Sequence, residues 1–382
     1  MSSDVYIFNA SNDSALACDS ISYSASKYIN IFENDLATLP MFFANENDIV
    51  LVDEQPNTEF IETLRLLGFT IPHFEIKTEF LKNTYSGKYQ LNALKPWGWS
   101  KATHTLFRYI KNDFKHINAC SNWNQILRDL SGRQTAALVL QNILEDKNLP
   151  FINKTAIPKG ITDTSSIPEL FKISKHWVLK SPWSSSGRGL MKISPERFTA
   201  NEQTWAQGII NEQGFIMVEP WHKKVFDFSM LFSVSSDKIT PLCFSTFKTN
   251  EKGQFIGSFI HWPQENELSK MGISNSEMET ISQTIAHSLQ KQNFNKYYEG
   301  WIGVDAMVVD ENGTFKIHPC VEINCRYTIG HLAFVLRNYC KQNVNTILRI
   351  GSISEFNTSN KTSIALTPIS KKTQFVAWLE DV

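Results

Sequence analysis

Short apolar runs separated by polar turns dominate the first seventy residues. Residues 5–8 and 49–52 are continuous apolar runs, which are typical of strands buried on both faces of a sheet. Residues 59–67 carry apolar side chains at helical spacing and end at Gly68, and residues 69–71 predict a short third strand. The order strand, helix, strand predicts an open α/β unit with parallel strands.

After residue 100 the pattern changes from helices to strands joined by tight turns. One helix is predicted to begin near Lys101, and another spans 132–147 with Ser131 as its cap. From Trp177 onward, we predict strands at 177–180, 214–219, 226–234, 241–248, 255–261, 302–309 and 314–324, turns at 251–254 and 310–313, and one helix at 276–292. The second part of the chain is therefore expected to be an α+β unit rich in hairpins.

Composition excludes several classes of protein. The 382 residues fit two or three packed units, and 42% apolar residues are enough for a large core. A formal net charge of −1 gives no general attraction to nucleic acid or to an anionic membrane. The six cysteines form no CxxC pair, which favours a reducing compartment. Because the sequence also has no signal-peptide pattern and no run of about 18 apolar residues, we expect a cytoplasmic protein with no membrane or nucleic-acid partner.

A lysine at the end of an apolar strand leads directly into a Ser/Gly-rich loop. Lys180 follows Val178 and Leu179, and the loop contains Ser184, Ser185, Ser186, Gly187, Arg188 and Gly189. Glycine lets backbone N–H groups approach an oxyanion, and lysine and arginine neutralise phosphate charge. The loop is neither a Walker A sequence nor GxGxxG, and an ordinary hairpin tip is the alternative.

A second apolar strand ends in an acidic residue and an extended linker. Glu219 and Trp221 follow residues 215–218, and Asp227 begins the next predicted strand. Backbone groups of such a linker can bind the edge of an adenine ring, and carboxylates can bind its amino group or ribose hydroxyls. The alternative is a strand end with an exposed glutamate.

Two later strands bring oxygen-bearing side chains toward one another. Glu322 and Asn324 are two residues apart on one strand and share a face, and Asp305 lies on its hairpin partner. Two carboxylates and an amide oxygen suit Mg²⁺. The alternative is a solvated sheet edge.

In this order, the three features resemble the ATP-grasp superfamily of carboxylate ligases over roughly residues 131–330. The resemblance implies two α+β subdomains that close on ATP, preceded by an α/β domain. We therefore expect an N-terminal α/β domain at residues 1–120 and an ATP-grasp domain at 121–382, with a lid subdomain at about 155–220.

The resemblance also implies a role for each matching residue. Lys180 and the loop from Ser184 to Gly189 would contact the phosphates, with Arg188 as a catalytic cation of that loop. Glu219 and Trp221 would bind adenine and Asp227 ribose. Asp305, Glu322 and Asn324 would bind Mg²⁺, Arg326 would lie near acyl-phosphate chemistry, and Arg133 would be a first basic nucleotide contact. Asp305 and Glu322 are farther apart in sequence than in compact members, so a longer hairpin or a bulge is required.

The expected function is that of an ATP-dependent, ADP-forming ligase that joins a small-molecule or peptide carboxylate to an amine or another nucleophile through an acyl phosphate. ATP and Mg²⁺, with Mn²⁺ as an alternative, are the expected cofactors, and a homodimer remains open. A kinase of the same fold and a non-catalytic nucleotide-binding protein are the alternative functions. Candidate substrate-binding residues are Asn9, Asn12, Asp13, Lys248 and His261, and Asp53 ends a strand at the same edge as the first three. A chemical role for Cys325 or His318 stays open.

Overall fold

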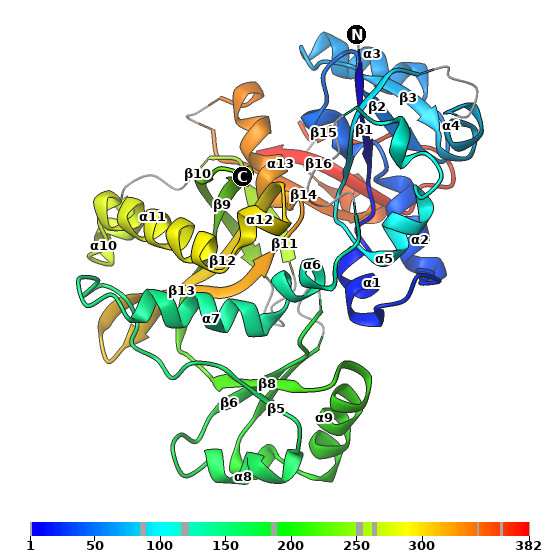
Figure 1. The fold of residues 1–382 in the computed structure, drawn as a ribbon. Coiled ribbons are helices and arrows are strands. Elements are labelled where there is room, and N and C mark those ends of the chain that lie inside the picture. Colours follow the sequence, from blue (N-terminus) through cyan, green and yellow to red (C-terminus); the bar gives the residue numbers. More distant parts are fainter. Residues whose placement is uncertain are drawn as a thin grey trace.

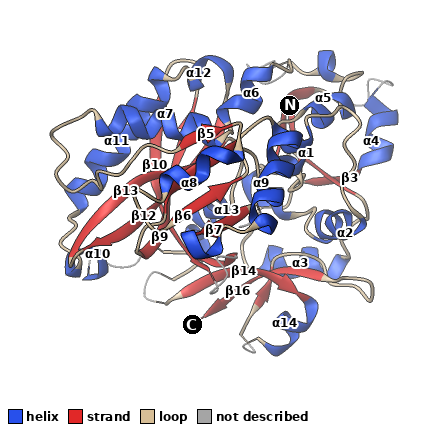
Figure 2. Cartoon of the chain, turned by 90° about the horizontal axis from the view of Figure 1, so that it is seen from below, coloured by secondary structure: helices blue, strands red, loops and turns tan. Residues whose placement is uncertain are grey.

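The computed structural model describes residues 2–84, 89–115, 122–184, 189–249, 255–261, 266–341, 344–359 and 362–381. Its secondary structure forms three sheets with helices packed around them (Figures 1 and 2). None of its helices, within these ranges, is both long enough and apolar enough to cross a membrane.

The N-terminal sheet is parallel and has the strand order β3-β2-β1-β4. Its strands are β1 (Ser3–Ile7), β2 (Ile49–Val52), β3 (His73–Ile76) and β4 (Leu91–Pro96), and its helices are α1 (Asn12–Cys18), α2 (Lys27–Asp35), α3 (Thr58–Leu66), α4 (Lys77–Thr84) and α5 (Lys101–Leu106). The parallel α/β unit predicted from the sequence is confirmed. The third strand is not at residues 69–71 but at β3, because only residues 73–76 lie in register with β2.

The central sheet is antiparallel and has the strand order β13-β12-β9-β10-β11-β14-β16-β15. Its strands are β9 (Lys224–Val234), β10 (Ile239–Thr249), β11 (Phe255–Phe259), β12 (Gly300–Glu311), β13 (Thr314–Asn324), β14 (Thr346–Ser352), β15 (Ile364–Ala365) and β16 (Phe375–Asp381). The helices in this part of the chain are α6 (Gln125–Leu130), α7 (Arg133–Leu144), α10 (Asn266–Lys270), α11 (Asn275–Lys291), α12 (Phe294–Tyr297), α13 (Ile329–Leu336) and α14 (Ile353–Thr358). The N-cap of helix α7 is Gly132 and not the predicted Ser131, whose hydroxyl donates to the Leu127 carbonyl instead.

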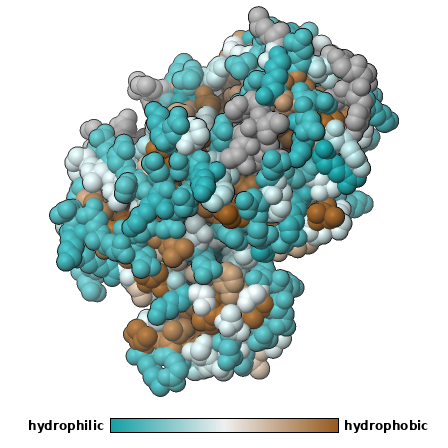
Figure 3. Space-filling view, in the orientation of Figure 1, coloured by the Kyte–Doolittle hydropathy of each residue, from teal (hydrophilic) through white to brown (hydrophobic). Residues whose placement is uncertain are grey.

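A smaller four-stranded sheet forms a separate lobe at the lower end of the molecule (Figures 1 and 3). Its order is β5-β8-β6-β7, from β5 (Lys159–Ile161), β6 (Trp177–Lys180), β7 (Leu190–Ile193) and β8 (Ile216–Pro220), covered by α8 (Ile167–Leu170) and α9 (Ala200–Gln213). This lobe has its own apolar core, which includes Trp177, Leu179 and Ile216. The other two clusters of buried side chains each span both the N-terminal and the central sheet.

The β12–β13 hairpin contains the irregularity that the sequence spacing requires. Asn312 and Gly313 form its two-residue turn with φ values of 55° and 89°, as an Asn-Gly turn with two positive φ angles demands. Pairing is regular from Glu311 opposite Thr314 to Met307 opposite His318, and then shifts so that Asp305 lies opposite Glu322. Residues 319–321 thus lie opposite the single residue 306, and the predicted bulge is confirmed.

Candidate functional site

The bulge aligns the predicted metal ligands on one face of the central sheet. Asp305 pairs with Ser229 of β9 on one side and with Glu322 of β13 on the other, so these three side chains form a row across three strands. Asn324 shares this face because it is two residues from Glu322, and its Nδ2 donates to Asp305 Oδ2 at 3.1 Å. The structure therefore brings the three predicted ligands together.

Asp305 is half-buried and accepts hydrogen bonds from two neutral donors. The Ser229 hydroxyl donates to its Oδ1 and Asn324 to its Oδ2. Burial, together with the negative charge of Glu322, raises the pKa of Asp305 to about 6. Among the described residues, no three His, Cys, Asp or Glu side chains gather as a metal-binding group. Two carboxylates and an amide offer oxygen ligands, which fit Mg²⁺. A bound Mg²⁺ would also relieve the repulsion between the two carboxylates.

Arg133 connects the metal ligands to the loop that follows β6. It is the first residue of α7 and is buried. Its Nη2 lies 3.0 Å from Glu322 Oε2 and donates to Ser184 Oγ at 3.3 Å, and its Nε donates to the Ser181 carbonyl at 3.1 Å. The predicted basic contact therefore bridges the central sheet and the lobe.

The two ends of the Ser/Gly loop that follows β6 are joined by a backbone hydrogen bond. Ser181 N–H donates to the Gly189 carbonyl at 2.8 Å, and Gly189 has φ of 72°, a conformation that favours glycine. A Cβ at Gly189 would lie 2.6 Å from Ser181 Oγ. Ser184 lies at the described start of the loop. The predicted loop residues Ser185, Ser186, Gly187 and Arg188 lie outside the described residues.

Lys180 and Glu219 form a buried ion pair on adjacent strands of the lobe. Their side chains are 8% and 11% exposed, on β6 and β8 respectively. Lys180 also lies close enough to His318 on β13 that its charge helps to lower the pKa of that histidine, after burial and the neighbouring His222. Two predicted nucleotide contacts thus meet where the lobe faces the central sheet.

The predicted adenine and ribose residues lie along the same junction. The ring of His222, one residue beyond Trp221, packs against that of His318 in a tilted arrangement, with ring centroids 5.0 Å apart. Trp221 is partly exposed, and Lys192 Nζ lies 3.8 Å from the centroid of its ring. Asp227 pairs with Met307, two positions along from Asp305, so it shares the face of the metal ligands. Its carboxylate bonds to Lys224.

Arg326 is held by a residue of helix α1, in the N-terminal α/β unit. Asp13 accepts from Arg326 Nε at 2.9 and 3.1 Å and from Nη2 at 2.7 Å. Nη2 also donates to Asn324 Oδ1 at 2.8 Å, and Nη1 donates to the Tyr327 carbonyl at 3.2 Å. Since a guanidinium has five N–H groups, described protein atoms engage four of them.

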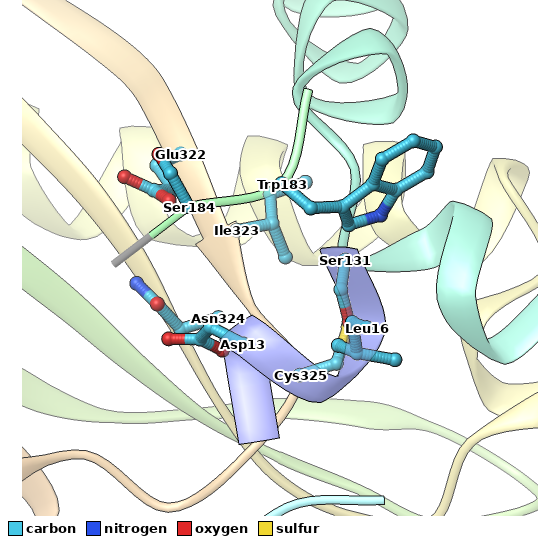
Figure 4. A pocket seen from close by; sticks show the side chains of 9 residues that line it. All are labelled: Asp13, Leu16, Ser131, Trp183, Ser184, Glu322, Ile323, Asn324 and Cys325. Carbon is cyan, nitrogen blue, oxygen red and sulfur yellow. The ribbon is translucent and has the colours of Figure 1, made fainter. Parts of the chain in front are cut away.

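A small pocket lies between these groups (Figure 4). Figure 4 shows Asp13 beside Asn324 and Glu322 beside Ser184, with Trp183 on the opposite wall. The pocket is lined by Asp13, Leu16, Ser131, Trp183, Ser184, Glu322, Ile323, Asn324 and Cys325. It therefore adjoins two of the three metal-ligand candidates and the start of the Ser/Gly loop.

Of the other candidate substrate residues, two asparagines contact Gly98, and the remaining three lie on other elements. Asn9 donates to the Gly98 carbonyl at 2.8 Å and accepts from the Gly98 N–H at 3.1 Å, and Asn12 is buried against the same glycine. These two asparagines tie the start of α1, which carries Asp13, to Gly98. Lys248 lies on β10 opposite Gly257 of β11, and His261 follows the end of β11. Asp53 follows β2 and bonds to Lys77.

Sequence reasoning missed one residue of the site, Ser229, and one contact, that between Asp13 and Arg326. Ser229 could have been found from its spacing, because it lies two residues beyond Asp227 on a predicted strand and so shares its face. The partnership of Asp13 with Arg326 had no such signal, since the two residues are 313 positions apart.

A scan of models of protein families finds no match to this sequence, and no curated protein matches it either. Solved structures do match it over nearly the whole chain. N5-carboxyaminoimidazole synthetase from Staphylococcus aureus, complexed with ADP, has a TM-score of 0.53 and 10% identity over 100% of this chain and 93% of that one. The carboxyaminoimidazole ribonucleotide synthase of Aspergillus clavatus, complexed with ATP, has a TM-score of 0.52 and 10% identity, over 100% and 94%.

The biotin carboxylase domain of the Hydrogenobacter thermophilus 2-oxoglutarate carboxylase, in complex with MgADP and bicarbonate, has a TM-score of 0.55 and 11% identity, over 99% of this chain and 86% of that one. At such identities the likeness establishes the fold alone. The ATP-grasp fold expected from the sequence is confirmed.

Proposed function

We propose that this chain is an ADP-forming, Mg²⁺-dependent ligase that joins a carboxylate to an amine, or to another nucleophile, through an acyl phosphate. The observation that carries the proposal is the row of Asp305 and Glu322 on the central sheet, where Arg133 pairs with Glu322. The Lys180–Glu219 ion pair lies close to His318 of the same hairpin. Structures of the same fold described with ATP, ADP or MgADP support nucleotide binding at this junction. We further propose that residues 1–120 and 121–382 act as two domains and that residues 155–220 are the lid.

The nucleotide would lie between the lobe and the central sheet. Glu219 and Trp221 would contact the adenine from the linker after β8, and Asp227 would bind ribose hydroxyls. Lys180, Arg133 and the loop from Ser184 to Gly189 would orient the triphosphate. This assignment is supported by the packing of His222 against His318, which brings the segment after β8 onto β13 close to Glu219.

Asp305, Glu322 and Asn324 would hold Mg²⁺, which supplies charge neutralisation for the transferred phosphoryl group. Each of the three nearby cations has an acidic partner: Arg133 has Glu322, Lys180 has Glu219 and Arg326 has Asp13. On nucleotide binding, Arg133 and Lys180 would therefore exchange their carboxylate partners for phosphate oxygens.

The acceptor would enter through the pocket beside Asp13 and Trp183. Arg326 retains one N–H group that is not engaged by described residues, and this group would stabilise the acyl phosphate and the tetrahedral intermediate that follows. Positioning supplies most of the acceleration in such a reaction, so no side-chain nucleophile is required. Burial raises the pKa of Cys325 to about 12, which argues against its use as a thiolate.

The test is a screen for ADP release with amino acids, short peptides and other carboxylic acids. Glu322→Gln should lower turnover at least about 100-fold, the range for removing one charge-stabilising group. Glu279→Gln, on the exposed face of α11, should leave turnover near the wild-type value. Near wild-type turnover by Glu322→Gln would reject the metal site.

Hydroxylamine distinguishes the ligase from a kinase of the same fold. An acyl phosphate is trapped as a hydroxamate, whereas a phosphorylated hydroxyl group is stable to hydroxylamine. Binding of ATP with no ADP release over hours, for every acceptor tried, would favour a non-catalytic nucleotide-binding protein.

A further inference from the structure

Asp13 belongs to α1 in the N-terminal domain, yet it contacts the centre of the candidate site. Its carboxylate binds the Arg326 guanidinium through two N–H groups, and the two side chains are only 15% and 19% exposed. The contact is thus a bidentate, largely buried ion pair between two domains. Removing one partner of such a pair leaves an uncompensated charge in a poorly solvated place.

A continuous chain of hydrogen bonds leads from Asp13 to the metal-ligand candidates. Arg326 Nη2 donates to Asn324 Oδ1, and Asn324 Nδ2 donates to Asp305 Oδ2. The arginine therefore determines which side of the Asn324 amide faces Asp305. Because an amide oxygen has two lone pairs, Oδ1 can accept from Arg326 and still bind a cation.

The position of Asp13 is itself fixed by the backbone that supports Arg326. Gly98 forms an isolated β-bridge with Arg326, and the Tyr327 N–H donates to the Trp97 carbonyl at 2.9 Å. Asn12, the neighbour of Asp13, packs so closely on Gly98 that a Cβ there would lie 2.4 Å from the Asn12 side chain. The segment Trp97–Gly98, directly after β4, thus contacts the backbone at Arg326 and the neighbour of Asp13, and so fixes the position of both members of the ion pair.

We propose that Asp13 is a positioning residue for the metal site: it orients and neutralises Arg326, and Arg326 in turn orients the Asn324 amide. The inference rests on the proposed metal site but not on the identity of the reaction. Without the Asp13 carboxylate, Arg326 would carry an unneutralised positive charge beside the cation and would be free to leave Asn324. The unneutralised charge would repel the cation, and this repulsion weakens metal binding.

The experiment measures ADP binding by calorimetry as a function of Mg²⁺ concentration, and again with EDTA. Asp13→Asn should raise the Mg²⁺ concentration at half-saturation by about 10- to 100-fold, the usual cost of losing a residue that orients a metal ligand. The affinity for metal-free ADP should stay within about threefold of wild type, because the side-chain hydrogen bonds of Asp13 to described residues all go to Arg326.

Asp4→Asn is the matched control. Asp4 is a similarly buried carboxylate of the same domain, 13% exposed, and it pairs with Lys95 away from the site. Its loss should change thermal stability but not the Mg²⁺ requirement. Asp13→Glu keeps the charge but not the bidentate geometry, and should give a smaller increase than Asp13→Asn. If Asp13→Asn does not fold, Asp13→Glu carries the test alone.

A Mg²⁺ requirement equal to that of wild type in the folded Asp13 variants would overturn the inference and leave the proposed function intact. Tighter binding of anions by Asp13→Asn would also overturn it, because Asp13 would then be a competitor for Arg326. If the wild-type protein shows no Mg²⁺-dependent ADP binding at all, the inference and the proposed function both fail.

Discussion

The ion pair between Lys180 and Glu219 should contribute strongly to the stability of the lobe. The perturbation is Lys180→Met, which keeps most of the volume of the lysine side chain and removes its charge. The Glu219 carboxylate would then remain on β8, 11% exposed and without its cation.

The cost follows from this burial. Breaking a buried ion pair by removal of one partner costs about 3–5 kcal/mol, whereas replacing both partners by neutral groups is often close to neutral. Lys180→Met should therefore destabilise the lobe by about 3 kcal/mol or more. The double variant with Glu219→Gln should recover at least half of that loss.

Hydrogen exchange followed by mass spectrometry measures this effect locally. Amides of β6 and β8 should exchange about 100-fold faster in Lys180→Met, since local opening free energies set exchange rates. Lys224→Met is the control: the pair of Lys224 with Asp227 is more exposed, at 38% for the lysine side chain, and such pairs contribute about 0–1 kcal/mol. Exchange within threefold of wild type in Lys180→Met, or no recovery in the double variant, would refute the reasoning.

Two further predictions concern glycine and histidine. Gly189→Ala should destabilise the base of the Ser/Gly loop by about 1–2 kcal/mol and weaken ADP binding, because of its φ of 72° and its contact with Ser181. Gly208→Ala in α9, where an added Cβ meets no atom within 4 Å, should instead stabilise by about 0.5–1 kcal/mol; calorimetry checks both, and equal effects would contradict the geometry. Burial lowers the pKa of His318 to about 3, so the folded state favours the neutral ring. The contribution of this neutral ring to the free energy of unfolding is fully present above about pH 6.5. It is lost by about 1.4 kcal/mol per pH unit as the pH falls toward 3. Urea titrations from pH 7 to 4 should show a shallower pH dependence for His318→Gln, and an unchanged slope would show that His318 does not titrate as described.

The strands of the site could be predicted because local pattern and turn chemistry agree there. The Asn312–Gly313 turn fixes the hairpin register at one end, and the excess of residues between Asp305 and Glu322 required a bulge. The pairing of β12 with β13 then followed from the need to place both carboxylates on one face.

The remaining features depend on contacts that local sequence does not encode. The wrong position of the third strand reflects competition between two weak apolar segments that only pairing with β2 decides. The pairing of Asp13 with Arg326 depends on how the N-terminal sheet docks against the central sheet, and hydrophobic periodicity carries no information about that docking.

The central claim is that the bulged hairpin places Asp305, Glu322 and Asn324 around one divalent cation. Its most direct test is anomalous diffraction from crystals grown with ADP and Mn²⁺, which substitutes for Mg²⁺ at oxygen ligands. We expect an anomalous peak that is surrounded by the side chains of these three residues and lies beside the phosphates of ADP. A nucleotide bound with its metal on any other side chains would contradict it.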